Sequence, residues 1–169
     1  VTIPATPITA QTVTNRFGLC LPTTKLVDEI YLQADIQIPP KAFPRGDEMV
    51  KNDYFLNHNR EIESALSGMN YRDQLIAGHK KDVVITNKLT SPLRNVAIYG
   101  WHERLGSFIQ YLTTFHHKDY VDYSHGIRFI SKTMYLDGKL VPIEEVLKLP
   151  NVAEMLSYEG VINDSQAYR

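Results

Sequence analysis

The segment Thr133-Met134-Tyr135-Leu136-Asp137-Gly138-Lys139-Leu140-Val141 decides the fold class of this chain. Asp137-Gly138 favours a tight turn between two antiparallel strands, one on each side of it. Other stretches rich in Val, Ile, Tyr, Phe and Thr precede it, and they predict strands at 74–77, 82–87, 96–102, 108–112 and 127–136. The spacers between these strands look too short for regular helical crossovers, so we expect a mainly antiparallel sheet.

Helices are predicted on both sides of this block of strands. One begins near Pro22 and carries an amphipathic apolar series up to Ala34, and another runs from about Asp53 to Ser67. Short helices are expected at 142–147 and 151–157. This order predicts an α+β fold in which N-terminal helices pack on a mainly antiparallel β-sheet and short helices follow at the C-terminal end.

The first residues differ in composition from the rest. Residues 1–17 are rich in Thr and Pro and are predicted to form an extended N-terminal arm. A single α+β domain is expected over residues 18–169, since a chain of this length can bury one proper core.

Composition excludes several classes of protein. With 43% hydrophobic and 22% charged residues, the chain is typical of a globular domain, and no apolar stretch approaches the roughly 18–20 residues needed to cross a membrane. The net charge is −1 and the basic residues are dispersed, which argues against nucleic-acid binding. Cys20 is the single cysteine, so an intrachain disulfide cannot form.

The richest chemistry lies in Tyr120-Val121-Asp122-Tyr123-Ser124-His125-Gly126-Ile127-Arg128-Phe129, next to an apolar run that predicts a strand. A buried polar group without a partner costs roughly 1–3 kcal/mol, so such a density of polar side chains is tolerated most easily at a site. Two further histidines, His79 and His102, also end apolar strands beside a glycine and a charged residue. We therefore expect the three histidines to share one polar cleft at the strand ends.

Three kinds of chemistry fit such a cleft, and the sequence leaves them open. Cys20 stands just before the first predicted helix, where the positive end of the helix dipole favours a thiolate, and a histidine could act as its base. The histidines, with Asp82, Asp119 or Asp122, could instead hold a zinc ion. Arg128 could hold a carboxylate in a bidentate pair, or pair with a nearby acid.

A common set of residues follows from these alternatives. The predicted catalytic residues are the histidines as general base, the aspartates as orienting acids and the cysteine as thiol, namely His102, His125, His79, Asp122, Asp82 and Cys20. The predicted substrate-binding residues are Arg128, Ser124, Lys81, Trp101 and Tyr123.

The segment Ser124-His125-Gly126-Ile127-Arg128 resembles the Ser-His-Gly-Cys-(Ile/Val)-Arg signature of L,D-transpeptidases, enzymes that crosslink peptidoglycan through a cysteine. Residues 98–102 fall about where that family has its first histidine motif. The nucleophilic cysteine of the signature is missing from this chain. The family's activity could therefore transfer only if Cys20 replaced the lost thiol.

The wider pattern of residues 20–31, 77–84, 96–102 and 120–128 resembles a family of secreted bacterial proteins to which no activity is assigned. This resemblance implies an extracellular or cell-envelope location. Together with the histidines, it leads us to expect a hydrolase or transferase that acts on peptide or amide bonds, with peptidoglycan as one candidate substrate. The alternatives are a non-catalytic module that binds a glycan or peptide, and an assembly protein that uses the same polar residues for subunit contacts.

Overall fold

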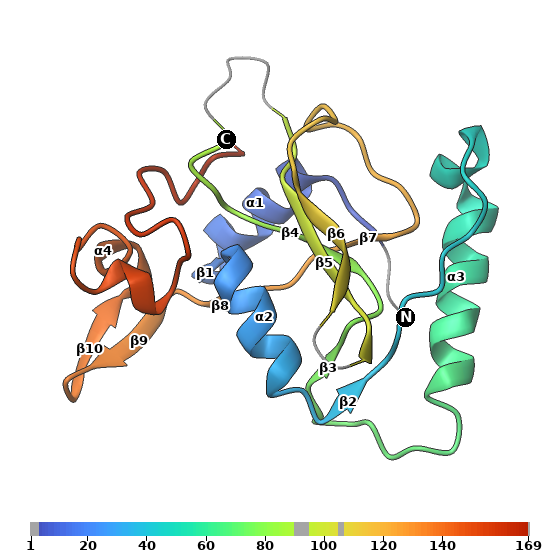
Figure 1. Ribbon diagram of the computed structural model, residues 1–169, viewed down its shortest axis with the longest axis horizontal. Coiled ribbons are helices and arrows are strands. Elements are labelled where there is room, and N and C mark those ends of the chain that lie inside the picture. The colour runs from blue at the N-terminus through green and yellow to red at the C-terminus, as the bar shows by residue number, and fades with distance from the viewer. Residues whose placement is uncertain (1–3, 90–94, 105–106, 169) are drawn as a thin grey trace.

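Four strands form the central sheet, in the order β6-β5-β4-β7, in a computed structural model that describes residues 4–89, 95–104 and 107–168 (Figure 1). The strand β5 (Ile98–His102) pairs antiparallel with β4 (Lys81–Val83) and with β6 (Phe108–Thr113). On the other side of β4, the short strand β7 (His125–Gly126) pairs in parallel. The predicted α+β fold class is confirmed, and the sheet is mixed at this one edge.

Three two-stranded pairs extend the architecture. Two of them are antiparallel, namely β1 (Leu19–Cys20) with β8 (Ile130–Ser131), and β9 (Thr133–Leu136) with β10 (Lys139–Pro142). The third is parallel and joins β2 (Ile36–Gln37) to β3 (Ile76–Ala77). The turn between β9 and β10 is formed by Asp137 (φ 49°) and Gly138 (φ 76°), which confirms the predicted tight turn.

The helices are α1 (Pro7–Phe17), α2 (Thr24–Leu32), α3 (Asn52–Ala65) and α4 (Ile143–Val146), with 3₁₀ turns η1 (Asp47–Val50) and η3 (Ala153–Met155). The two long helices expected from the sequence are confirmed as α2 and α3. No helix in the described ranges is both long and apolar enough to cross a membrane.

The prediction of an extended arm over residues 1–17 is wrong from Pro7 onward, because these residues form α1. The side chain of Thr6 accepts a hydrogen bond from the main-chain N–H of Thr9, and Pro7 occupies the first turn, where a missing N–H costs nothing. Gly18 ends the helix in the left-handed conformation. Thr and Pro, the residue types that suggested an extended arm, thus mark the start of a helix here.

The two faces of the sheet pack against different parts of the chain. Val84 on one face packs with Val27 of α2. Val83 and Ile85 on the other face join a larger core that includes Cys20 and residues from the C-terminal part of the chain. Because neighbouring residues of a strand point to opposite faces, this alternation fixes where each polar side chain of β4 can point.

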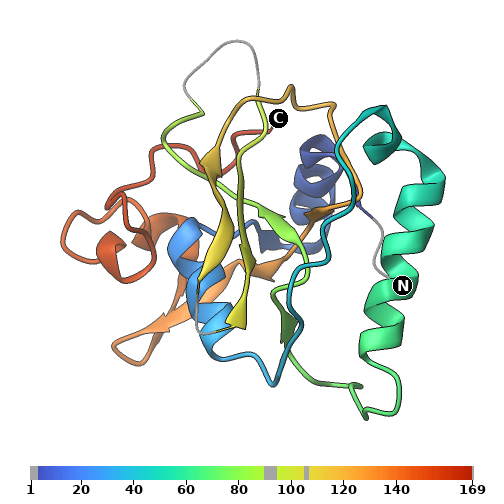
Figure 2. The same cartoon turned by 45° about the vertical axis from the view of Figure 1, so that its right-hand side comes forward.

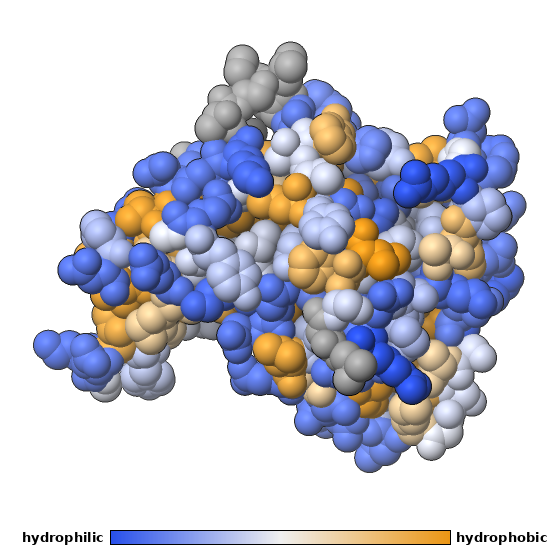
Figure 3. Space-filling model, viewed as in Figure 1, coloured by the Kyte–Doolittle hydropathy of each residue, from blue (hydrophilic) through white to orange (hydrophobic). Residues whose placement is uncertain are grey.

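Helix α3 stands apart from the central sheet, with the segment 38–50 running between them (Figures 1 and 2). It has a small core of its own, in which Ile62 and Leu66 pack on Ile38. On the face seen in Figure 3, apolar residues gather in small patches among hydrophilic ones.

Gly78 sets how closely its own segment can approach the main chain at Ile38. It has φ 100°, and a Cβ atom on it would lie 2.5 Å from the main-chain oxygen of Ile38. We expect Gly78→Ala to lower the free energy of unfolding by about 2–5 kcal/mol, from backbone strain plus overpacking. Gly68→Ala is the matched control, since Gly68 has φ 78° with open space around it, and it should cost only about 1–2 kcal/mol. Equal losses in chemical denaturation would contradict this account.

Candidate functional site

The three predicted histidines occupy separate environments. His102 lies on the face of the sheet that α2 covers, where its Nε2 is 2.7 Å from Asp28 Oδ1 and its ring stacks on Tyr31. The side chain of Lys81 points to the face of the sheet opposite α2. His125 pairs in register with Lys81 and therefore lies on that face as well. The prediction of one shared cleft is wrong for these two, because the two-residue period of a strand separates them.

His102 fastens α2 to the sheet. The carboxylate of Asp28 also accepts hydrogen bonds from the hydroxyls of Tyr99 (3.1 Å) and Tyr158 (3.0 Å). The group joins α2, β5 and the C-terminal segment through one shared acceptor. This arrangement is that of a structural network, and the general-base role of His102 stays a prediction.

Cys20 is buried in the main core, 2% exposed, with its thiol pointing to the main-chain oxygen of Ser131 at 3.3 Å. Burial, aided by the charge of Glu144, raises the pKa of this thiol to about 12. No described histidine is a hydrogen-bond partner of the thiol. The predicted nucleophilic role does not fit, because an apolar environment disfavours the thiolate.

Cys20 should therefore resist modification in the folded protein. A pKa of about 12 in place of 9.0 lowers the thiolate fraction at neutral pH about 1000-fold. We expect an aromatic disulfide reagent to react with the native thiol on the order of 1000-fold more slowly than with the chain in denaturant. Equal rates would restore Cys20 as a candidate nucleophile.

Asp122, Ser124 and His125 form a sealed polar cluster. The main-chain N–H and the hydroxyl of Ser124 donate to Asp122 Oδ1 at 2.8 and 2.5 Å, and His125 Nε2 lies 3.8 Å from Asp122 Oδ2. Burial would raise the pKa of Asp122, but His125, the bonds from Ser124 and the charge of Lys81 together lower it. His125 and Ser124 are fully buried. Their exposure is too low for the catalytic and substrate-binding roles predicted for them.

Asp82 and Arg128 form an ion pair at the edge of the sheet. Arg128 Nε lies 3.5 Å from Asp82 Oδ2, and Nη2 donates to the main-chain oxygen of Ile76 at 3.1 Å. Burial raises the pKa of Asp82, and the guanidinium opposes that rise. Arg128 Nε is itself buried and faces Asp82. The side chain of Arg128 as a whole is 20% exposed and lines a cavity.

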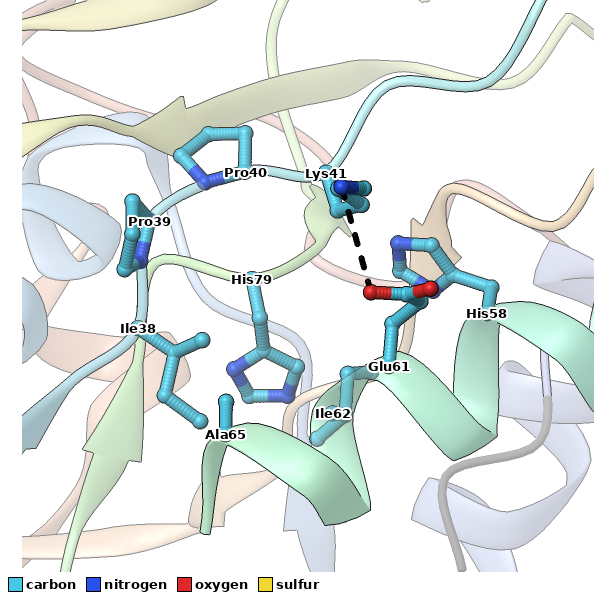
Figure 4. Close-up of a pocket in the computed structure, with 9 residues that line it drawn as sticks. All are labelled: Ile38, Pro39, Pro40, Lys41, His58, Glu61, Ile62, Ala65 and His79. Atoms are coloured by element: carbon cyan, nitrogen blue, oxygen red, sulfur yellow. Dashed lines mark ion pairs between the residues drawn. The ribbon is translucent and has the colours of Figure 1, made fainter.

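Two cavities meet at His79. One, of about 360 Å³, is lined by His79, Arg128, Gln74 and apolar side chains, and the other, of about 190 Å³, is lined by His79, His58, Lys41, Glu61 and apolar side chains. The two share His79 and Ile62, and we call them together the α3 groove. Figure 4 shows the ring of His79 pointing toward α3, between Ile38 and Ile62.

His58 is the site residue that our sequence analysis missed. Its two ring nitrogens and Nδ1 of His79 make no hydrogen bond of good geometry although all three are buried. Burial, with the charges of Lys80 and His79, lowers the pKa of His58 to about 3. The signal was present, since His58 lies three residues after Phe55 and four before Ile62 on the apolar side of a predicted helix.

The remaining predicted residues gather elsewhere. Lys81, Trp101 and Tyr123 line a third cavity of about 190 Å³ together with Arg45 and other side chains of the segment 38–50. Of the predicted set, His79 and Arg128 thus line the α3 groove, these three line the cavity over the sheet, and the rest line neither. In the parts of the chain that the structure describes, no three His, Cys, Asp or Glu side chains are placed so that they could hold a metal ion.

No protein-family model, curated protein or solved structure matches this chain. The resemblance to L,D-transpeptidases and the implied location outside the cell stay predictions.

The buried histidines give the protein a defined response to acid. Burial lowers the pKa of His58 to about 3 and those of His79 and His125 to about 4. The unfolded chain takes up these protons near pH 6.5, whereas the folded state resists them until about pH 4. The free energy of unfolding therefore has its full value above pH 6.5 and falls as the pH drops toward 4. We expect the free energy of unfolding to fall by up to about 1.4 kcal/mol per pH unit for each histidine. His58→Phe should reduce that slope, and an unchanged slope between pH 6.5 and 4.5 would contradict the assignment.

Proposed function

We propose that this protein is a non-catalytic binding module that holds a peptide by its terminal carboxylate and an apolar side chain in the α3 groove. The observation that carries the proposal is the side chain of Arg128, which is 20% exposed and lies at the wall of a largely apolar cavity. A ligand suited to this wall needs one acidic group and an apolar body.

The carboxylate is assigned to Arg128. A guanidinium offers five N–H groups in a planar fork that matches the two oxygens of a carboxylate. Asp82 and the main-chain oxygen of Ile76 occupy only part of this fork. The ion pair with Asp82 also holds the guanidinium in place before any ligand arrives.

The apolar body is assigned to the larger cavity. Its apolar wall consists of Ile62, Leu66, Leu75, Ile76 and Ile127. A sugar would bring several hydroxyl groups into contact with this wall, and each one buried without a partner is costly. The lining therefore supports an apolar side chain, and a peptide over a glycan.

The state of the histidines supports binding rather than proton transfer. A catalytic acid or base works best with a pKa near the operating pH, whereas burial lowers the pKa of His79 to about 4. At neutral pH its imidazole is uncharged, and the residue lines both cavities of the groove. Such a group suits a hydrogen bond to the main chain of a peptide. Hydrolysis of peptide or amide bonds stays a prediction from the sequence, without an assigned nucleophile.

The proposal is tested with N-acetyl-leucine and N-acetyl-leucinamide, which differ in the carboxylate alone. By isothermal titration, we expect the acid to bind at least about 10-fold more tightly than the amide, because a hydrogen bond to a charged group contributes about 1.5–3 kcal/mol. Arg128→Gln should remove this preference. The matched control is Arg16→Gln, in the last turn of α1, which should retain it.

The comparison of acid and amide uses the unaltered protein, so it stands even if loss of Arg128 destabilises the fold around Asp82. Equal binding of both compounds, or no binding of N-acetylated Ala, Val, Leu or Phe, would overturn the proposal. Cleavage of an acetylated dipeptide by the protein, followed by mass spectrometry, would overturn its non-catalytic part. Tighter binding of N-acetylglucosamine would favour a glycan ligand.

A further inference from the structure

The third cavity lies over the sheet face opposite α2, and it shares no lining residue with the α3 groove. Two separate parts of the chain form it. The segment 38–50 contributes Phe43 and Arg45, and the sheet contributes Lys81 and Trp101. Tyr123 completes the wall and ties the two parts together, because Phe43 N donates to its hydroxyl at 2.7 Å.

Trp101 has an unusual backbone at this cavity. Its φ is 59°, the preceding Gly100 has φ 100°, and the pairing of β5 with β6 shifts register between Ile98 and Gly100. A non-glycine residue in the left-handed region costs about 1–2 kcal/mol. Such strain persists where the surrounding structure requires it, and it gathers at functional sites. Here it turns the indole so that its N–H donates to the main-chain oxygen of His79 at 3.2 Å while its ring borders the cavity.

One cation lies over this ring, and a second lines the same cavity. Lys81 Nζ lies 4.7 Å from the centre of the indole, and Arg45 lines the same cavity. Burial lowers the pKa of Lys81, the charge of Arg45 lowers it further, and the charge of Asp122 opposes the shift. Within the described ranges neither cation forms an ion pair. Two like charges at one cavity, neither of them held in an ion pair, favour an anion at the same place.

We infer that this cavity is a binding site for an oxyanion group, which Arg45 and Lys81 hold above the indole of Trp101. Phosphate, sulfate and carboxylate share the required chemistry, namely negative oxygens that accept hydrogen bonds from a guanidinium and an ammonium. A volume of about 190 Å³ accommodates such a group and a short attachment.

The site is independent of the peptide groove. Phe43, Tyr123 and His58 form an aromatic wall between them, with ring centres 5.0 Å apart for Phe43–Tyr123 and for His58–Tyr123. The oxyanion site therefore stands even if no peptide binds beside Arg128. The two proposals fail separately, since each rests on its own cations.

Trp101 makes the test direct, because it is the single tryptophan of the chain. Sodium phosphate, sulfate and acetate are titrated at constant ionic strength while the tryptophan emission is recorded. We expect a saturable change as the anion draws the ammonium of Lys81 away from the indole. Lys81→Met keeps the apolar stem and should weaken the response at least about 10-fold, as should Arg45→Gln in an exposed segment.

The matched control is Lys25→Met. Lys25 also carries its ammonium over an aromatic ring, at 5.7 Å from the centre of Tyr158, but it belongs to α2. Its loss should leave the emission response intact. A non-saturable response, or one that survives loss of both Lys81 and Arg45, would overturn the site. Phosphate or sulfate binding more tightly than acetate assigns a phosphorylated or sulfated ligand, and acetate binding more tightly assigns a carboxylate.

Discussion

The ion pair between Arg128 and Asp82 is the interaction on which the arrangement of this protein depends. Asp82 lies in the central strand β4 and is 7% exposed, so its charge must be compensated inside the protein. The guanidinium that compensates it follows β7, the one strand that joins the central sheet in parallel. Removing one partner of a buried pair costs about 3–5 kcal/mol, because the other charge is left alone. The edge of the sheet and the wall of the α3 groove are therefore fixed by the same contact.

The close packing of β7 against β4 also depends on the compensation of buried charges. Gly126 of β7 lies so near β4 that a Cβ atom on it would be 2.6 Å from the Cβ of Lys80. Lys80, itself buried, donates to the main-chain oxygen of Tyr123, and the charge of Asp122 opposes the fall in its pKa that burial causes. The short segment from Tyr123 to Arg128 thus supplies compensation for two charged side chains of the region around β4. This explains the density of polar residues there without requiring each of them to touch a ligand.

Local signals in the sequence were sufficient for much of the fold. Thr23 accepts the N-terminal hydrogen bond of α2 at Leu26, and Asp137-Gly138 forms the tight turn, because both depend on neighbours within a few residues. Helix α1 was missed although Thr6 and Pro7 carry its start signal, since the same residue types also fit an extended chain. The division of His102 and His125 between the two faces follows from strand boundaries and register, which residue type alone does not set.

The candidate sites were predictable only in part, for a similar reason. His79 and Arg128 were singled out from local polarity, but His58, which lines one cavity together with His79, comes from α3, which the sequence does not place beside the sheet. Cys20 fits both a helix-start nucleophile and a small apolar residue, and only its pairing in β1 decides between them. Trp101 owes its position to a backbone strain at a register shift that no residue pattern indicates.

The sharing of Arg128 limits what the α3 groove can achieve. A ligand carboxylate at this guanidinium would lie near Asp82, which is already 3.5 Å from Nε, so the two acids compete for one cation and repel each other. The attraction that remains is smaller than that of an unshared arginine. Most of the affinity must then come from the apolar wall, at roughly 25 cal/mol per Å² of apolar surface removed from water. A groove built in this way is suited to weak, reversible capture of apolar chain ends. Its selectivity comes from recognition of the ligand carboxylate and does not require a high overall affinity.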